Sequence, residues 1–185
     1  MDPPGITRHR RPFLAPLWLT LLAILVVLGF AIGFYRSATT AVVLLMPPVA
    51  KEPGTIDDPP LSPEGEQRAQ RLAQMFADAS GGGRLDGIYV SDDRRAQQTA
   101  APLTQRLHRA PVVFRAGEAR TTAARMVREH PGGTVLVIAS GAALPQIIHE
   151  LAAVEVPPAA PGESDTLYMV SVPSFGRPHL VRIRL

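Results

Sequence analysis

The sequence predicts a three-layer α/β/α domain with a mainly parallel sheet, preceded by one transmembrane helix. Short apolar segments rich in β-branched residues alternate with amphipathic segments over residues 41–172, a pattern typical of strands joined by helical crossovers. Residues 13–35 contain no charged side chain. The length of 185 residues allows one ordinary domain besides such a span.

The apolar segment is long enough to cross a bilayer. It reads FLAPLWLTLLAILVVLGFAIGFY over residues 13–35, and about 20 residues are needed to cross a hydrocarbon core. Trp18 and Tyr35 are suited to the two headgroup interfaces. The alternatives are a cleaved signal peptide, whose apolar region is usually shorter, and a buried core helix. We expect an uncleaved signal anchor whose partner is the lipid bilayer.

Positive charges flank the segment unequally. Arg8, Arg10 and Arg11 precede it, whereas only Arg36 follows directly. The positive-inside rule then places residues 1–12 in the cytoplasm as an N-terminal tail. Residues 37–185 are expected outside the cytoplasm, in the periplasm or its equivalent, as the folded domain of a single-pass protein of the inner (cytoplasmic) membrane.

The outer domain divides into alternating strands and helices. A strand over 41–46 ends at Pro47 and Pro48, because proline cannot continue a central strand. Ser62, Pro63 and Glu64 have the order of an N-cap, a first helical proline and a first-turn acid, so a helix begins there and ends at the glycines 81–83. The sequence then predicts strands over 87–90, 111–114 and 134–138, helices over 94–108, 118–130 and 145–154, and a final hairpin of strands 166–172 and 179–185.

Composition excludes several classes of site. The chain has no cysteine, which excludes a disulfide scaffold, a cysteine-ligated zinc site and a thiol nucleophile. Of its 19 basic and 16 acidic residues, four basic and one acidic lie in residues 1–36. The remaining chain is therefore balanced, and nothing in it indicates nucleic-acid binding. We predict no cofactor and no metal.

Ligands of such sheets bind beyond the carboxyl ends of the strands, here residues 46–51, 91–100 and 138–143. The second of these segments contains a spaced pattern: a serine, three variable residues, Arg-Ala, two variable residues and Thr-Ala. The residues at the fixed positions of this pattern are Ser91, Arg95, Ala96, Thr99 and Ala100. This pattern, supported by segments 61–65 and 144–148, resembles the histidine phosphatase (phosphoglycerate mutase-like) superfamily. The resemblance covers about residues 41–172.

The resemblance fails at the positions where the family carries its catalytic residues. Members carry Arg-His after the first strand, where this chain has Pro47 and Pro48, and Gly-His after the fourth, where it has Ala139 and Ser140. In the family the first histidine attacks phosphorus, while two arginines and the second histidine hold the phosphoryl oxygens. Of that set, only Arg95 is carried over. The sequence therefore predicts a degenerate member without catalytic histidines.

Three side chains remain as candidates, each with a simpler interpretation. Arg95 binds an anion near its helix N-terminus, or pairs with Asp92 or Asp93 on the surface. Glu118 is the family's acid, or an ordinary first-turn acid. Ser140 is a hydroxyl nucleophile, or a small residue of a turn.

The remaining titratable residues have simple interpretations. Asp57 and Asp58 suggest a metal ligand pair, although two adjacent acids in a proline-rich loop are typical of a solvated turn. The histidines of the outer domain are expected to be structural or solvated; they are His108, His130, His149 and His179.

Three functions are consistent with these residues. The first is a catalytically inactive, membrane-anchored histidine phosphatase-like domain that acts as a binding or scaffold module, with a protein partner or a weakly bound anion. The second is a phosphoester hydrolase with a rebuilt site that uses Arg95, Ser140 or Glu118. In the third, the fold is retained by descent and function resides in the membrane helix or its partners.

Overall fold

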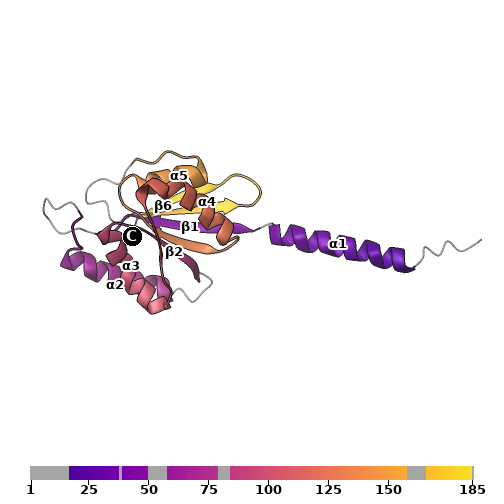
Figure 1. Cartoon of the computed structure of the whole chain (residues 1–185), viewed down its shortest axis with the longest axis horizontal. Coiled ribbons are helices and arrows are strands. Elements are labelled where there is room, and N and C mark those ends of the chain that lie inside the picture. The colour runs from indigo at the N-terminus through magenta and orange to yellow at the C-terminus, as the bar shows by residue number, and fades with distance from the viewer. Residues whose placement is uncertain (1–16, 38, 50–57, 79–83, 158–165, 185) are drawn as a thin grey trace, which may run out of the picture. The chain divides into compact units, whose positions relative to one another are not determined.

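The structure is a computed structural model that describes residues 17–37, 39–49, 58–78, 84–157 and 166–184. Its internal contacts divide the chain into two compact units, residues 1–37 and 38–185. Figure 1 shows the helix of the first unit and the mixed helices and strands of the second.

The first unit contains helix α1, Leu17–Ser37. Helix α1 overlaps most of the apolar run predicted as a span, of which residues 13–16 lie outside the described part of the chain. Its large apolar side chains are exposed, including Phe30 at 78%. No helix within the described residues is long and apolar enough to cross a membrane.

The second unit is built on a six-stranded sheet with the order β3-β2-β4-β1-β5-β6. Strands β1 and β2 both pair in parallel with β4, and β3 pairs in parallel with β2. Strand β5 is antiparallel to β1, and β6 completes the predicted hairpin with β5. The bounds are β1 Thr40–Met46, β2 Leu85–Ser91, β3 Val112–Phe114, β4 Thr134–Ile138, β5 Thr166–Pro173 and β6 His179–Arg184.

Helices cover both faces of this sheet, which confirms the predicted three layers (Figure 1). The core on one face joins Ile88 and Leu136 to Leu72 of α2 and Leu103 of α3. The core on the other face joins the sheet to α4 and α5, around the fully buried Tyr89. The helices span α2 Pro63–Asp78, α3 Arg94–Leu107, α4 Ala119–Glu129 and α5 Ala143–Ala152, and a 3₁₀ turn, Ala116–Glu118, precedes α4.

Two elements, α5 and β2, differ from the predicted bounds by two residues at one end or both. Helix α5 begins at Ala143 rather than at Pro145, because proline is tolerated in a first turn, where its missing N–H is not needed. Strand β2 begins at Leu85, two residues earlier, and its pairing with β4 is irregular between Leu85 and Gly87. Such an irregularity weakens the alternation on which the sequence prediction depends.

Candidate functional site

Strands β1, β2 and β4 end side by side, so the segments that follow them meet at one edge of the sheet. Met46 pairs with Ile138, which also pairs with Val90. Beyond these pairs, the backbone N–H of Ala139 donates to the carbonyl oxygen of Met46 at 3.2 Å. The three predicted strand-end segments therefore form one edge, which we call the strand-end site.

The segment after β1 is buried in the body of the domain. Pro47, Pro48 and Val49 are all buried, and Val49 is completely inaccessible. The N–H of Val49 donates to Oγ1 of Thr99 at 3.3 Å, and this hydroxyl donates to the carbonyl oxygen of Arg95 at 2.8 Å. The two prolines are therefore part of the packed interior next to the strand-end site.

The motif residues after β2 serve packing and hydrogen bonding. Ala96 and Ala100 are buried on the inner face of α3, and Thr99 binds the segment after β1. Ser91, only 2% exposed, lies at the end of β2, where its Oγ also contacts the carbonyl oxygen of Ile138 at 3.5 Å. Four of the five matching positions are thus explained by the fold itself.

The carboxylate of Asp93, which local sequence patterns do not single out, lies at the centre of the strand-end site. Asp93 Oδ2 accepts hydrogen bonds from Oγ of Ser91 and from Oγ of Ser140, the latter at 2.7 Å. Asp93 Oδ1 accepts from the N–H of Ala96 at 3.0 Å, which makes Asp93 the N-cap of α3. The N–H of Ser140 also donates to Ser91 Oγ at 3.3 Å. The available signal was an aspartate directly before a helix.

Arg95 is partly exposed on the first turn of α3. Among the described residues, its guanidinium makes no hydrogen bond and no ion pair, so the predicted surface pair with Asp92 or Asp93 is absent there. Asp92 is exposed, and its carbonyl oxygen accepts from the side-chain amide of Gln97 at 2.9 Å. Arg95 is therefore a cation near the strand-end site whose charge no described carboxylate neutralises.

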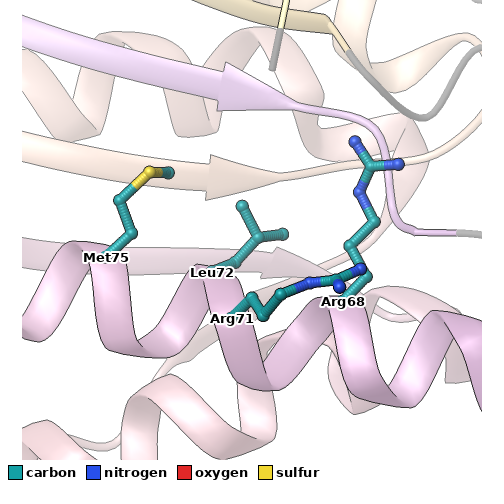
Figure 2. A pocket seen from close by; sticks show the side chains of 4 residues that line it. All are labelled: Arg68, Arg71, Leu72 and Met75. Carbon is teal, nitrogen blue, oxygen red and sulfur yellow. The ribbon is translucent and has the colours of Figure 1, made fainter.

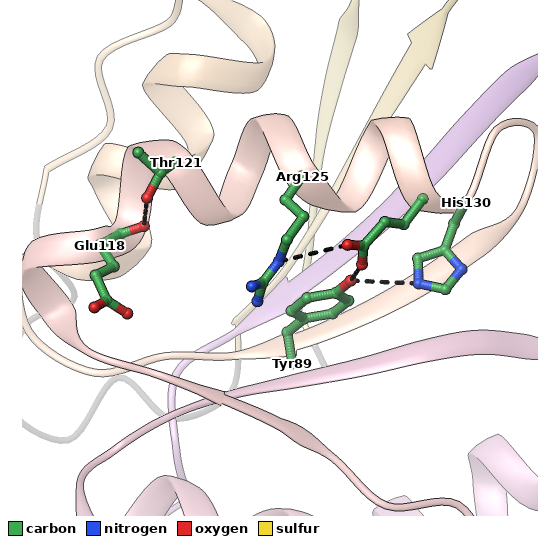
Figure 3. A network of polar contacts seen from close by, with 6 residues as sticks. Tyr89, Glu118, Thr121, Arg125 and His130 are labelled. Atoms are coloured by element: carbon green, nitrogen blue, oxygen red, sulfur yellow. Dashed lines mark hydrogen bonds and ion pairs between the residues drawn. The ribbon is translucent and has the colours of Figure 1, made fainter.

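Glu118 lies at the start of α4 and is exposed. Its Oε2 accepts from the N–H of Arg115 at 3.3 Å, and its Oε1 lies 4.0 Å from the Arg115 guanidinium. Its carbonyl oxygen accepts from Thr121 Oγ1 at 2.9 Å, as Figure 3 shows. Through these contacts Glu118 stabilises the start of α4.

The acidic pair in the loop before α2 falls partly outside the description, because Asp57 is not described. Both carboxylate oxygens of Asp58 accept from the N–H of Arg94, at 3.0 and 3.2 Å. Within the described ranges, no group of three or more His, Asp and Glu residues is arranged to hold a metal ion.

Four of the five histidines lie in the described residues, each within a helix or strand or directly after a helix. His108 caps the end of α3 in a left-handed conformation, with φ of 49°. His130 caps the end of α4, while the exposed His149 and His179 lie within α5 and at the start of β6. None of the four follows β1 or β4.

A second polar cluster lies under α4 (Figure 3). The hydroxyl of Tyr89 donates to Glu129 Oε2 at 2.8 Å and lies 3.4 Å from Nε2 of His130. Arg125 stacks on the Tyr89 ring at 5.8 Å and lies 3.9 Å from Glu129. Burial, followed by the neighbouring Glu129 carboxylate, raises the pKa of Tyr89 to about 12. No local sequence pattern predicts this cluster, because its members come from β2 and from the end of α4.

Two cavities lined by described residues lie beside the helices. One, of about 390 Å³, is lined by side chains that project from α2: Arg68, Arg71, Leu72 and Met75 (Figure 2). The other, of about 260 Å³, lies between α2 and α3. Neither is lined by Pro47, Asp93 or Ser140.

Residues 49–118 match the family model of the histidine phosphatase superfamily, branch 1. No curated protein shows significant sequence similarity to the chain.

Solved structures share the fold at low sequence identity. The protein histidine phosphatase SixA complexed with tungstate has a TM-score of 0.60 at 18% identity, covering 77% of this chain and 96% of that one. Mycobacterial glucosyl-3-phosphoglycerate phosphatase has a TM-score of 0.59 at 16% identity, covering 76% and 97%. Phosphoglycerate mutase from Bacillus anthracis has a TM-score of 0.57 at 12% identity, covering 80% and 95%. The second unit of the chain therefore has a histidine-phosphatase-type α/β fold.

Proposed function

We propose that the chain is a membrane-anchored, catalytically inactive histidine phosphatase-like protein whose folded domain is a binding or scaffold module outside the cytoplasm. The observation that carries this proposal is the composition of the strand-end site. Buried Pro47 and Pro48 follow β1, and Ser140 follows β4 with its hydroxyl hydrogen-bonded to Asp93.

Covalent phosphoryl transfer needs a nucleophile with an available lone pair, in line with the phosphorus atom. A proline within the chain has no such lone pair and no N–H to donate to an oxygen. The histidines at 108, 130, 149 and 179 lie on other elements of the domain. The residues after β1 and β4 therefore lack the histidine nucleophile on which the family's chemistry depends.

The charge of the site also argues against phosphoryl transfer. The transition state spreads negative charge over three oxygens, and positioned cations provide most of its stabilisation. Asp93 lies among the groups that would surround such a charge, and Arg95 is the basic residue carried over from the family pattern. One arginine and one aspartate at the start of the same helix leave little net positive charge for three oxygens.

The second candidate is a phosphoester hydrolase with a rebuilt site that uses Ser140 and Arg95. The contact between Ser140 Oγ and Asp93 Oδ2 favours it, because a carboxylate can accept a proton from a hydroxyl. However, the same oxygen also accepts from Ser91, and Asp93 caps a helix. This arrangement fits a structural bridge better than a nucleophile and its base.

The anchor and the location of the domain are part of the proposal. Residues 13–35 carry no charge over 23 positions, of which 17–35 lie within the helix α1. The three arginines before this segment favour a cytoplasmic N-terminus. The folded domain is then periplasmic or otherwise extracytoplasmic, where a module without catalysis recruits a protein partner to the membrane.

Trapping of a phosphoenzyme tests the catalytic part of this proposal. The full chain, purified in mild detergent, is incubated with a radiolabelled acyl phosphate and with a phosphorylated aryl substrate, then quenched in alkali to preserve phosphohistidine. We expect no label on the protein. Stoichiometric labelling that survives denaturing gels would contradict the inactive assignment.

A further inference from the structure

We infer that Asp93 is the specificity-determining residue of the strand-end site: its carboxylate occupies the hydrogen-bond donors that an external anion would need and keeps phosphate-like anions out. This inference rests on the proposed function, because it treats the site as one that does not process phosphate. It extends that function by naming the residue that sets which ligands the site rejects.

Both serine hydroxyls at the strand-end site already have an acceptor. A serine hydroxyl has one proton to donate. The hydroxyl protons of both Ser91 and Ser140 are directed to Asp93 Oδ2, the latter over 2.7 Å. Ser91 is almost completely buried, so this arrangement is held inside the domain. An incoming anion would find both hydroxyls already used.

The start of α3 would otherwise attract an anion through its free N–H groups. The N–H of Ala96 donates to Asp93 Oδ1 at 3.0 Å. The N–H of Arg94 donates to the carboxylate of Asp58 at 3.0 and 3.2 Å. Two carboxylates of the protein itself, from separate segments, therefore occupy this helix start.

The negative charge of Asp93 also opposes anion binding. A dianion at the strand-end site would lie beside the negative charge of Asp93, and two neighbouring negative charges repel each other. Arg95 offers one positive charge in return, on the same helical turn. Asp93 therefore acts both by occupying the donors and by repulsion, and its neutralisation should convert a site that rejects anions into one that binds them.

The experiment measures the binding of tungstate, a stable phosphate analogue, to the full chain in mild detergent by calorimetry. Asp93→Asn removes the charge and keeps a side chain that caps helices well. Asp92→Asn is the matched control, because it removes the same charge from the exposed neighbouring residue. We expect Asp93→Asn to bind tungstate at least about tenfold more tightly than the parent chain, or about 1.4 kcal/mol. Asp92→Asn should change the affinity by less than about twofold.

Thermal unfolding of each variant establishes that it is folded. If Asp93→Asn does not fold, Asp93→Ser provides the same test, since serine is also a good neutral N-cap. Tungstate affinity in the folded Asp93 variant no higher than in Asp92→Asn would overturn the inference, and so would tight binding by the parent chain. A failure of the proposed function has a different signature, namely phosphoenzyme formation or turnover by the parent chain, which this titration does not measure.

Discussion

Tyr89 in the middle of β2 donates a hydrogen bond to Glu129 at the end of α4, over 2.8 Å from hydroxyl to Oε2. This bond joins the sheet to a covering helix through a completely buried aromatic ring. Because burial disfavours the charged phenolate and the phenol donates to the Glu129 carboxylate, the fold favours the protonated form of Tyr89.

Tyr89→Phe should lower the free energy of unfolding by about 0.5–1.5 kcal/mol, the usual net contribution of one hydrogen bond. The pKa of Tyr89 rises from its ordinary value of 10.0 to about 12 in the folded protein. Its contribution is therefore complete below pH 10 and is lost as the pH rises toward about 12. Denaturant unfolding of both proteins across this range should show a steeper loss of stability in the parent. Equal slopes would show that Tyr89 titrates alike in folded and unfolded chains.

Gly87→Ala should destabilise the same cluster by steric contact. A Cβ at Gly87 would lie 2.7 Å from Nε2 of His130 and 3.1 Å from the Tyr89 ring. Overpacking of this kind typically costs about 1–3 kcal/mol. Gly117→Ala is the control, because a Cβ there meets no atom within 4 Å. Thermal unfolding should show a lower midpoint for Gly87→Ala than for Gly117→Ala, and similar midpoints would contradict the observed close approach.

The order of helices and strands was predictable because each element carries its own local signal. Pro63 after Ser62 indicated the start of α2, and the apolar run 134–138 indicated β4 with its observed bounds. Prediction was less accurate where a local signal was misleading. Pro145 suggested a helix start, although it lies within the first turn of α5.

The centre of the strand-end site was not predictable from local patterns. Ser91 and Ser140 are 49 residues apart, and they meet at Asp93 only because β2 and β4 are neighbours in the sheet. Likewise, Tyr89 meets Glu129 through the packing of α4 on β2. What the sequence did indicate was the edge of the sheet, since the segments after β1, β2 and β4 were expected there.

Phosphate should bind the parent chain only weakly, with a dissociation constant in the millimolar range or above. One charge-assisted hydrogen bond contributes about 1.5–3 kcal/mol, and association itself is costly. Calorimetry of Arg95→Ala should show whatever weak binding exists reduced further. Arg94→Ala, which removes an exposed arginine from the preceding position, should leave it unchanged. Micromolar affinity that depends on Arg95 would contradict this estimate of the site.

The orientation of the chain can be tested with a reporter that fluoresces only in the cytoplasm, fused after Leu185. With Arg8, Arg10 and Arg11 held inside, the fusion should be dark although the protein fractionates with membranes. A fusion at residue 1 should be bright and serves as the positive control. Bright fluorescence from an intact, membrane-inserted C-terminal fusion would reverse the proposed topology.

Restoring part of the family's chemistry should not restore activity. Pro47→Arg with Pro48→His supplies a guanidinium and a nucleophile, but position 140 still lacks an imidazole and Asp93 keeps its negative charge. We expect no aryl phosphatase activity from this double variant, and only weak turnover when Ser140→His is added. Rates approaching those of an ordinary phosphatase from the double variant would show that the second histidine is dispensable in this site.

The most direct test of the account is the steady-state hydrolysis of an aryl phosphate by the unaltered full chain in mild detergent. Each tenfold increase in rate requires about 1.36 kcal/mol of transition-state stabilisation, and the single arginine carried over from the family pattern, Arg95, cannot supply several such increases. We predict no product above the background of the matched Arg95→Ala preparation. Turnover that persists through repeated purification and disappears in Arg95→Ala would contradict the assignment of an inactive domain.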